Sequence, residues 1–174
     1  MNSSGAGPRS EVSRPPRPAA GFKLDALCVV SLLAVSACNQ PAAHVAPVAG
    51  QLSRLVVDPY LSVDAALAAD RVDGLQARAS EISSAARTLG PSAVAIDKAA
   101  AQLASAADLA DARTRFGVLS LAIDAYMTDQ HLAPPTGVRV AFCPMAMRPW
   151  LQKDGALRNP YYGSQMLTCG SFRN

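Results

Sequence analysis

The chain has 174 residues, half of them apolar but only 5% aromatic, which suits one modest domain of closely packed helices better than a thick sheet core. The net charge is +3, and residues 1–37 hold four of the 16 basic and two of the 13 acidic residues, so the remainder is almost neutral. This balance excludes an electrostatic interaction with nucleic acid as the main activity.

The first 37 residues have the pattern of an export leader. Residues 1–20 have a composition typical of disorder, and Lys23 precedes an apolar run that is too short to span a bilayer. The run ends in Val35-Ser36-Ala37-Cys38, which resembles the lipobox of bacterial lipoproteins. The resemblance implies that Cys38 is diacylated and anchors the chain to a membrane. A core helix and an ordinary cleaved leader are the alternatives.

The residues after Cys38 indicate location and domain organisation. In Gram-negative lipoproteins a residue such as Asn39 at this place usually goes with export to the outer membrane, so we expect the chain to face the periplasm there. Residues 38–56 contain Pro and Ala without periodicity and predict a flexible tether, which leaves 57–174 as the domain. Cys28 leaves with the leader, so the folded part holds one cysteine pair.

Apolar residues at three- and four-residue spacing predict about four helices between residues 58 and 130. Asp58-Pro59 is a helix-start signal, Asp70 and Asp108 can cap two further helices, and Gly90-Pro91 interrupts the pattern. The predicted helices cover residues 60–69, 71–89, 92–106 and 109–130. Short loops make neighbouring helices antiparallel. The predicted fold is mainly α, a small up-and-down bundle with a C-terminal irregular or short-β segment that carries Cys and Met.

The helices carry no visible catalytic constellation. Asp124, Asp129 and His131 are close in sequence, but Asp124 is expected to face solvent and His131 lies at the helix end. We find no nucleophile–base pair, paired acids or histidine-rich zinc site. The sequence therefore favours a protein that is not an enzyme.

Sulfur-containing residues concentrate in the C-terminal segment, residues 138–170. Residues 138–142 alternate in a β-like way and predict a short strand that leads into Cys143. Cys143, Met145 and Met147 then occupy every second position, so on an extended chain their side chains would point to one side. Met166 and Cys169 lie three residues apart near the end. Such soft ligands suit thiophilic metals, above all Cu(I).

Several blocks of this segment, together with Arg113-x-x-Phe116-x-x-x-Ser120 upstream, resemble one bacterial family across residues 57–172. The C-terminal blocks are Cys143-Pro144-Met145-Ala146, Trp150-Leu151, Leu157-Arg158-Asn159-Pro160-Tyr161-Tyr162-Gly163 and Met166-Leu167-Thr168-Cys169-Gly170. The family is a domain of unknown function that occurs in exported proteins and lipoproteins. It is also fused to periplasmic adaptor subunits of copper/silver efflux pumps of the resistance-nodulation-division class. The resemblance implies heavy-metal handling, with an efflux-pump adaptor or another metal-handling envelope protein as partner.

Two interpretations of the cysteine pair remain open. Cys143 and Cys169 can act as thiolates that bind Cu(I) together with Met145 and Met166, with Met147 as a spare or exchanging ligand. Alternatively they form a disulfide, the usual fate of a cysteine pair in an oxidising compartment, which closes a structural or interaction module without metal. A redox-switched site that binds metal only when reduced combines the two.

Overall fold

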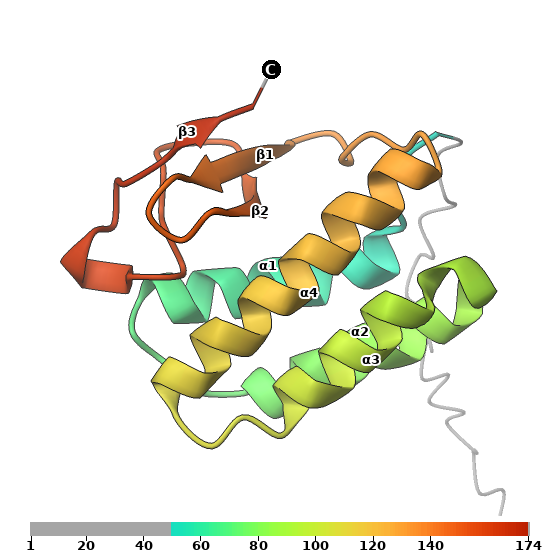
Figure 1. The fold of residues 1–174 in the computed structure, drawn as a ribbon, viewed down its shortest axis with the longest axis horizontal. Coiled ribbons are helices and arrows are strands. Elements are labelled where there is room, and N and C mark those ends of the chain that lie inside the picture. Colours follow the sequence, from blue (N-terminus) through green and yellow to red (C-terminus); the bar gives the residue numbers. More distant parts are fainter. Residues whose placement is uncertain (1–49, 174) are drawn as a thin grey trace, which may run out of the picture. The chain divides into compact units, whose positions relative to one another are not determined.

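The computed structural model describes residues 50–173, which form four helices followed by a small sheet (Figure 1). The α-helices are α1 (Arg54–Ala68), α2 (Leu75–Thr88), α3 (Val94–Ala104) and α4 (Leu109–Asp129), with the 3-10 turns η1 (Pro91–Ala93) and η2 (Gly163–Gln165). The strands are β1 (Val138–Cys143), β2 (Arg148–Lys153) and β3 (Ser171–Phe172). The predicted class, a mainly α bundle with a short C-terminal β segment, is confirmed. The predicted leader, Cys38 and most of the tether lie outside the described residues.

Helix α1 begins earlier than predicted. Ser53 caps it, its hydroxyl accepting a hydrogen bond from the backbone N–H of Leu55 at 3.3 Å, and Pro59 lies inside the helix. The expected start at Asp58-Pro59 is therefore wrong. Leu52 is buried, and its N–H donates to the carbonyl oxygen of Ala133 at 3.0 Å. Residues 51–56 belong to the folded domain, because the burial of Leu52 and Val56 outweighs the signal of Asp58-Pro59.

The other helix boundaries show how tertiary contacts compete with capping signals. Asp70 does not cap α2, which begins at Leu75 after Gly74 in the left-handed conformation. Asp70 is instead paired with Arg113 of α4. Helix α4 starts as predicted, since the Asp108 carboxylate accepts a hydrogen bond from the N–H of Asp111 at 2.8 Å. A carboxylate already bound to a distant arginine is not available as an N-cap, which explains the difference.

The core between the helices is built largely from alanine and aliphatic residues. Consecutive helices pack against each other, and fully buried alanines at their contacts let the helices approach closely. These include Ala79, Ala86, Ala100 and Ala112. Tyr60 joins three elements: its hydroxyl oxygen lies 2.7 Å from that of Ser120 on α4 and accepts a hydrogen bond from the N–H of Leu151 on β2 at 3.3 Å. The sheet is thereby fixed to the helices.

The sheet has the order β2-β1-β3, and both pairings are antiparallel. Strands β1 and β2 form a hairpin in which Ala141 faces Trp150, and β1 also pairs with β3 so that Phe142 faces Ser171. In Figure 1 the sheet lies over α1 and α4. The strand predicted at residues 138–142 is confirmed, whereas β2 was not predicted. None of the helices described in residues 50–173 is long and apolar enough to cross a membrane.

Candidate functional site

The fold brings Cys143 and Cys169 into contact, although 25 residues separate them in sequence. Cys143 ends β1, and the antiparallel pairing of Phe142 with Ser171 places the residues just before β3 beside it. Both cysteines are free thiols, and Cys143 lies close enough to Cys169 to raise the pKa of its thiol. Cys143 is fully buried, and Cys169 is half-buried. The two thiols therefore form one site with access from the side of Cys169.

Cys143 points to the same face of the sheet as Ala141 and Trp150, because side chains alternate along a strand and cross-strand partners share a face. The loop after β2 covers this face. The Gln152 side chain donates a hydrogen bond to the carbonyl oxygen of Ala156 at 3.0 Å, and Tyr161 packs edge-on against Trp150 with ring centroids 5.9 Å apart. The loop thus excludes water from Cys143 and ends in the segment that carries Cys169.

Asn159 fixes the position of Cys169. Its amide nitrogen Nδ2 donates a hydrogen bond to the carbonyl oxygen of Cys169 at 2.8 Å, while its Oδ1 accepts one from the N–H of Tyr161, also at 2.8 Å. Asn159 is fully buried, and its backbone N–H donates a hydrogen bond to the carbonyl oxygen of Leu167 at 2.7 Å. One side chain therefore ties the loop to the cysteine.

Gly170 allows β3 to approach β1. Its φ is +137°, and a Cβ built there would lie 2.8 Å from the carbonyl oxygen of Phe142 and 2.8 Å from the Trp150 ring. A residue with a side chain would push the strand away and separate the two thiols. This close approach explains in physical terms why the Cys-Gly pair stands at this place.

Arg113 clamps the same loop to the helices. Its Nε donates to the carbonyl oxygen of Pro160 at 3.1 Å, and its guanidinium also binds the carbonyl oxygen of Leu67 at 3.0 Å and the Asp70 carboxylate. Hydrogen bonds from Ser164 and Arg113 lower the pKa of Asp70, so it stays charged. Arg113, one of the α4 residues in the family resemblance, thus holds the cysteine-bearing loop against the helices.

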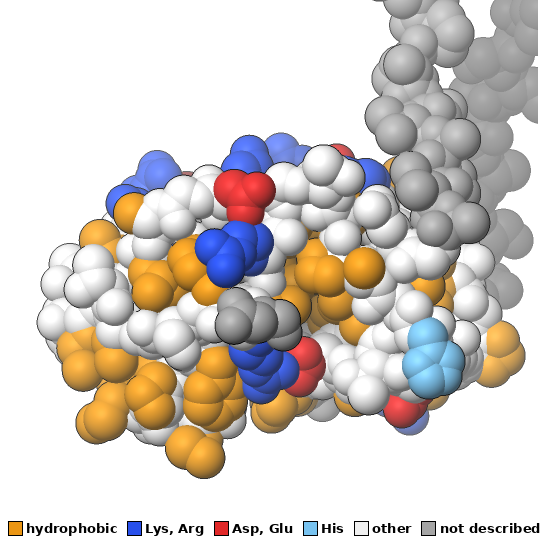
Figure 2. Space-filling view, turned by 90° about the horizontal axis from the view of Figure 1, so that it is seen from above, with side chains coloured by type: hydrophobic (Ala, Val, Ile, Leu, Met, Phe, Trp, Pro, Cys, Tyr) orange, Lys and Arg blue, Asp and Glu red, His pale blue; other side chains and the backbone are white. Residues whose placement is uncertain are grey.

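The methionines are not arranged as the alternating pattern predicts. Residues 144–147 form the turn between β1 and β2, with Met147 at a φ of +52°, so the extended chain expected after Cys143 is wrong. A hairpin turn reverses the chain and ends the two-residue side-chain period. Met145 is 63% exposed, Met147 70% and Met166 37%. Figure 2 shows hydrophobic side chains gathered at one end of the domain (orange, lower left).

The environment of Cys169 affects its acidity. Desolvation and the neighbouring Cys143 raise the pKa of the Cys169 thiol. At neutral pH this cysteine is protonated, so a metal ion that binds here must displace its proton.

The donor set fits a two-thiolate site for a soft ion. Within residues 50–173 no group of three or more His, Cys, Asp and Glu side chains converges, so the described part offers the cysteine pair without a third ligand of these types. Cu(I) accepts soft sulfur ligands, and the methionines supply further sulfur atoms on the segments that follow Cys143 and precede Cys169.

Comparisons with known proteins add no identification. No model of a known protein family matches the chain, and no curated protein or solved structure shows significant similarity to it. The family resemblance therefore stays a prediction that rests on its sequence blocks.

One buried acidic residue was missed in the sequence. Asp64 on α1 is 6% exposed and lies three residues after Leu61, on the helix face predicted to be apolar. A charged residue at an apolar position of the helical pattern is the signal that identifies it.

Proposed function

We propose that this chain is a lipid-anchored, periplasm-facing protein that binds Cu(I) through Cys143 and Cys169, for sequestration or for transfer to an efflux system. The observation that carries the proposal is the contact between two free thiols at the edge of the sheet. Thiolate sulfur is a ligand type that favours Cu(I) over the harder divalent ions.

The site has the features that ion transfer requires. Cys143 is fixed and buried, and Cys169 is half-buried beside it, so one ligand holds the ion while the other remains accessible to a partner. Binding releases the thiol protons, and the raised pKa of Cys169 makes the affinity rise with pH.

The exposed methionines support this function. Met145 and Met147 lie in the turn directly after Cys143, and the carbonyl oxygen of Met166 accepts a hydrogen bond from the N–H of Cys169 at 3.0 Å. Large apolar side chains on a surface lose the free energy that burial would provide, so their exposure favours a role in contacts. We assign them the capture of Cu(I) and its passage to the thiols.

The second candidate function is a disulfide-closed interaction module of the cell envelope. The same observation favours it, because the adjacent thiols can be joined in an oxidising compartment. The bridge would close a loop of roughly 25 residues and contribute about 3 kcal/mol to stability on the chain-entropy model.

The experiment uses the full chain with Cys28 and Cys38 replaced by Ser, so that two thiols remain. Free thiols are counted with and without reductant, and both forms are titrated with Cu(I) against a chromogenic chelator. The proposal expects one tightly bound Cu(I) per reduced chain, lost in Cys143→Ser and in Cys169→Ser. A stable disulfide with no copper binding after reduction would leave the interaction module.

Substitutions of the methionines distinguish the capture of Cu(I) by these residues from its binding by the two cysteines. Met145→Leu, Met147→Leu and Met166→Leu are expected to slow copper loading while the bound stoichiometry is kept. Met127→Leu, at a buried position of α4, is the control and should leave the loading rate unchanged.

A further inference from the structure

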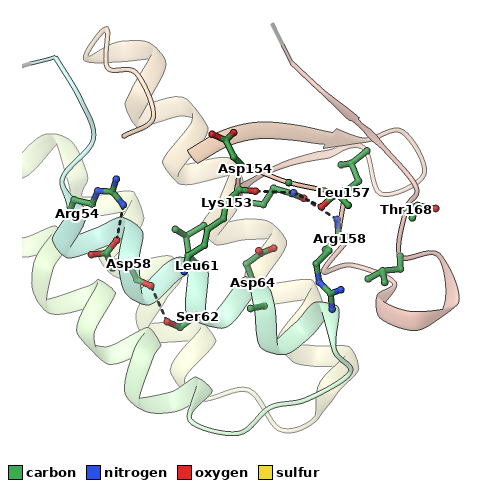
Figure 3. A pocket seen from close by; sticks show the side chains of 15 residues that line it. Arg54, Asp58, Leu61, Ser62, Asp64, Lys153, Asp154, Leu157, Arg158 and Thr168 are labelled. Carbon is green, nitrogen blue, oxygen red and sulfur yellow. Dashed lines mark hydrogen bonds and ion pairs between the residues drawn. The ribbon is translucent and has the colours of Figure 1, made fainter. Parts of the chain in front are cut away.

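A cleft of about 840 Å³ opens between α1 and the segment after β2 (Figure 3). Leu61 and Ala65 of α1 form one apolar wall, and Leu157 and Leu167 contribute to the other. The volume lies in the range of small-molecule sites in proteins. Polar and charged side chains, among them Asp64 and Arg158, line the rest of the cleft, so it offers both apolar surface and groups that can fix the orientation of a ligand.

Asp64 is an unpartnered acid in this cleft. Its side chain lines the cavity, the residue is 6% exposed, and its Oδ1 is buried without a hydrogen-bond partner among the described residues. Figure 3 shows its carboxylate on α1 directed toward the segment that carries Leu157 and Arg158. A buried carboxylate without a partner destabilises a fold, so the presence of Asp64 at this position requires an explanation.

Three cationic residues line the cleft, Arg54, Lys153 and Arg158, and none of them forms an ion pair with Asp64 within residues 50–173. The Arg54 guanidinium forms an ion pair with the Asp58 carboxylate at 3.4 Å and donates a hydrogen bond to the carbonyl oxygen of Thr136 at 2.6 Å. Arg158 is exposed and forms no ion pair with Asp64 within residues 50–173. The Asp64 carboxylate therefore has no cationic partner among the described residues, and a small cation that enters the cleft could supply one.

We propose that this cleft binds a small aliphatic amine, whose ammonium group donates hydrogen bonds to Asp64 while its hydrocarbon part packs against Leu61 and Leu157. The apolar walls select the hydrocarbon, and the buried carboxylate selects the positive charge. Arg158 competes with the ligand for Asp64. The site uses neither cysteine and does not depend on the proposed copper function.

Proton binding at Asp64 sets the pH dependence. Burial raises the pKa of Asp64 and the charge of Arg158 lowers it, so the amine binds better as pH rises through that pKa. The titratable or charged groups around Asp64 are Arg54, Asp58, Tyr60, Lys153, Asp154, Arg158 and Tyr161.

The test follows backbone amide chemical shifts of the full chain by NMR during titration with n-hexylamine. n-Hexanol serves as the neutral ligand of the same shape. We expect saturable shifts at Asp64 and at residues 153–158 with the amine, and at least tenfold weaker binding of n-hexanol. Binding should weaken at least tenfold in Asp64→Asn, strengthen several-fold in Arg158→Gln and stay unchanged in the control Asp73→Asn, which is exposed and lies outside the cleft.

Three results would overturn the proposal. The first is no saturable shift with n-hexylamine in the folded wild-type chain. The second is equal binding of n-hexanol and n-hexylamine, which would make the cleft an unselective apolar groove. The third is a loss of folding stability in both Asp64→Asn and Arg158→Gln without any amine binding, which would show an internal ion pair in solution. Thermal unfolding of each variant confirms that it is folded before its titration is interpreted.

Discussion

The side chain of Asn159 donates a hydrogen bond to the carbonyl oxygen of Cys169 at 2.8 Å. Through this bond the loop that covers Trp150 determines where the second thiol lies. The buried loop and the thiol pair are therefore one structural unit, and damage to the loop should appear as altered chemistry at Cys169.

Replacing Asn159 by Ala should loosen this unit. The variant leaves the buried N–H of Tyr161 and the carbonyl oxygen of Cys169 without their partners, which costs about 1–3 kcal/mol of unfolding free energy. Denaturant unfolding measures the loss, and the rate of thiol modification at Cys169 should rise. Gln165→Ala, at an exposed position in the same loop, is the control. An unchanged modification rate in Asn159→Ala would contradict this role.

Gly163→Ala should be more harmful than Gly74→Ala, although both glycines are left-handed, with φ of +54° and +70°. A Cβ at Gly163 would lie 2.0 Å from Oδ1 of Asp70 and 2.1 Å from Nη2 of Arg113, whereas nothing lies within 4 Å at Gly74. Both variants lose roughly 1–2 kcal/mol to backbone strain. Gly163→Ala also breaks the Arg113 clamp, so denaturant unfolding should show a larger loss. Equal losses of unfolding free energy in the two variants would mean that the contacts of Arg113 with Asp70 and the loop do not contribute to stability.

The charge of Asp64 should give the domain an unusual pH dependence. Burial raises the pKa of Asp64 in the folded state, whereas the pKa of an aspartate in the unfolded chain is about 4. Between these two values the folded state binds more protons, so the unfolding free energy falls as pH rises, by about 1.4 kcal/mol for each pKa unit of difference. Asp64→Asn should remove this slope, and Asp58→Asn should keep it. Urea unfolding over a pH series measures both.

Cys38 is predicted to carry the lipid anchor. Wild-type cells grown with a labelled fatty acid should incorporate label into the chain and retain it in the membrane fraction. Cys38→Ser should lose both properties, and Cys28→Ser should keep them. Label in Cys38→Ser would contradict the lipobox interpretation.

The sequence predicted the elements whose signals are local. Helix α4 has both an Asp108 cap and a long apolar period, and residues 138–142 have the alternation of a strand. Helix α1 was predicted too short, because Asp58-Pro59 is a strong start signal and Ser53 a weaker one. Burial of Leu52 and Val56 decided the boundary, and burial depends on the whole fold.

The candidate site was predicted in composition but not in arrangement. The two cysteines are the expected pair, yet only the register of β1 with β3 brings them together. Met145 and Met147 fall in a turn that contains no glycine, so their alternation resembled a strand. Asp64 was hidden because one acidic residue does not disturb an apolar pattern.

The most direct test of the copper proposal is X-ray absorption at the copper edge of the reduced chain loaded with one equivalent of Cu(I). The account predicts a first shell with two thiolate sulfurs, unchanged in Met145→Leu and Met147→Leu and lost in Cys143→Ser and Cys169→Ser. A first shell of nitrogen or oxygen, or a copper spectrum that is the same without the two cysteines, would contradict it.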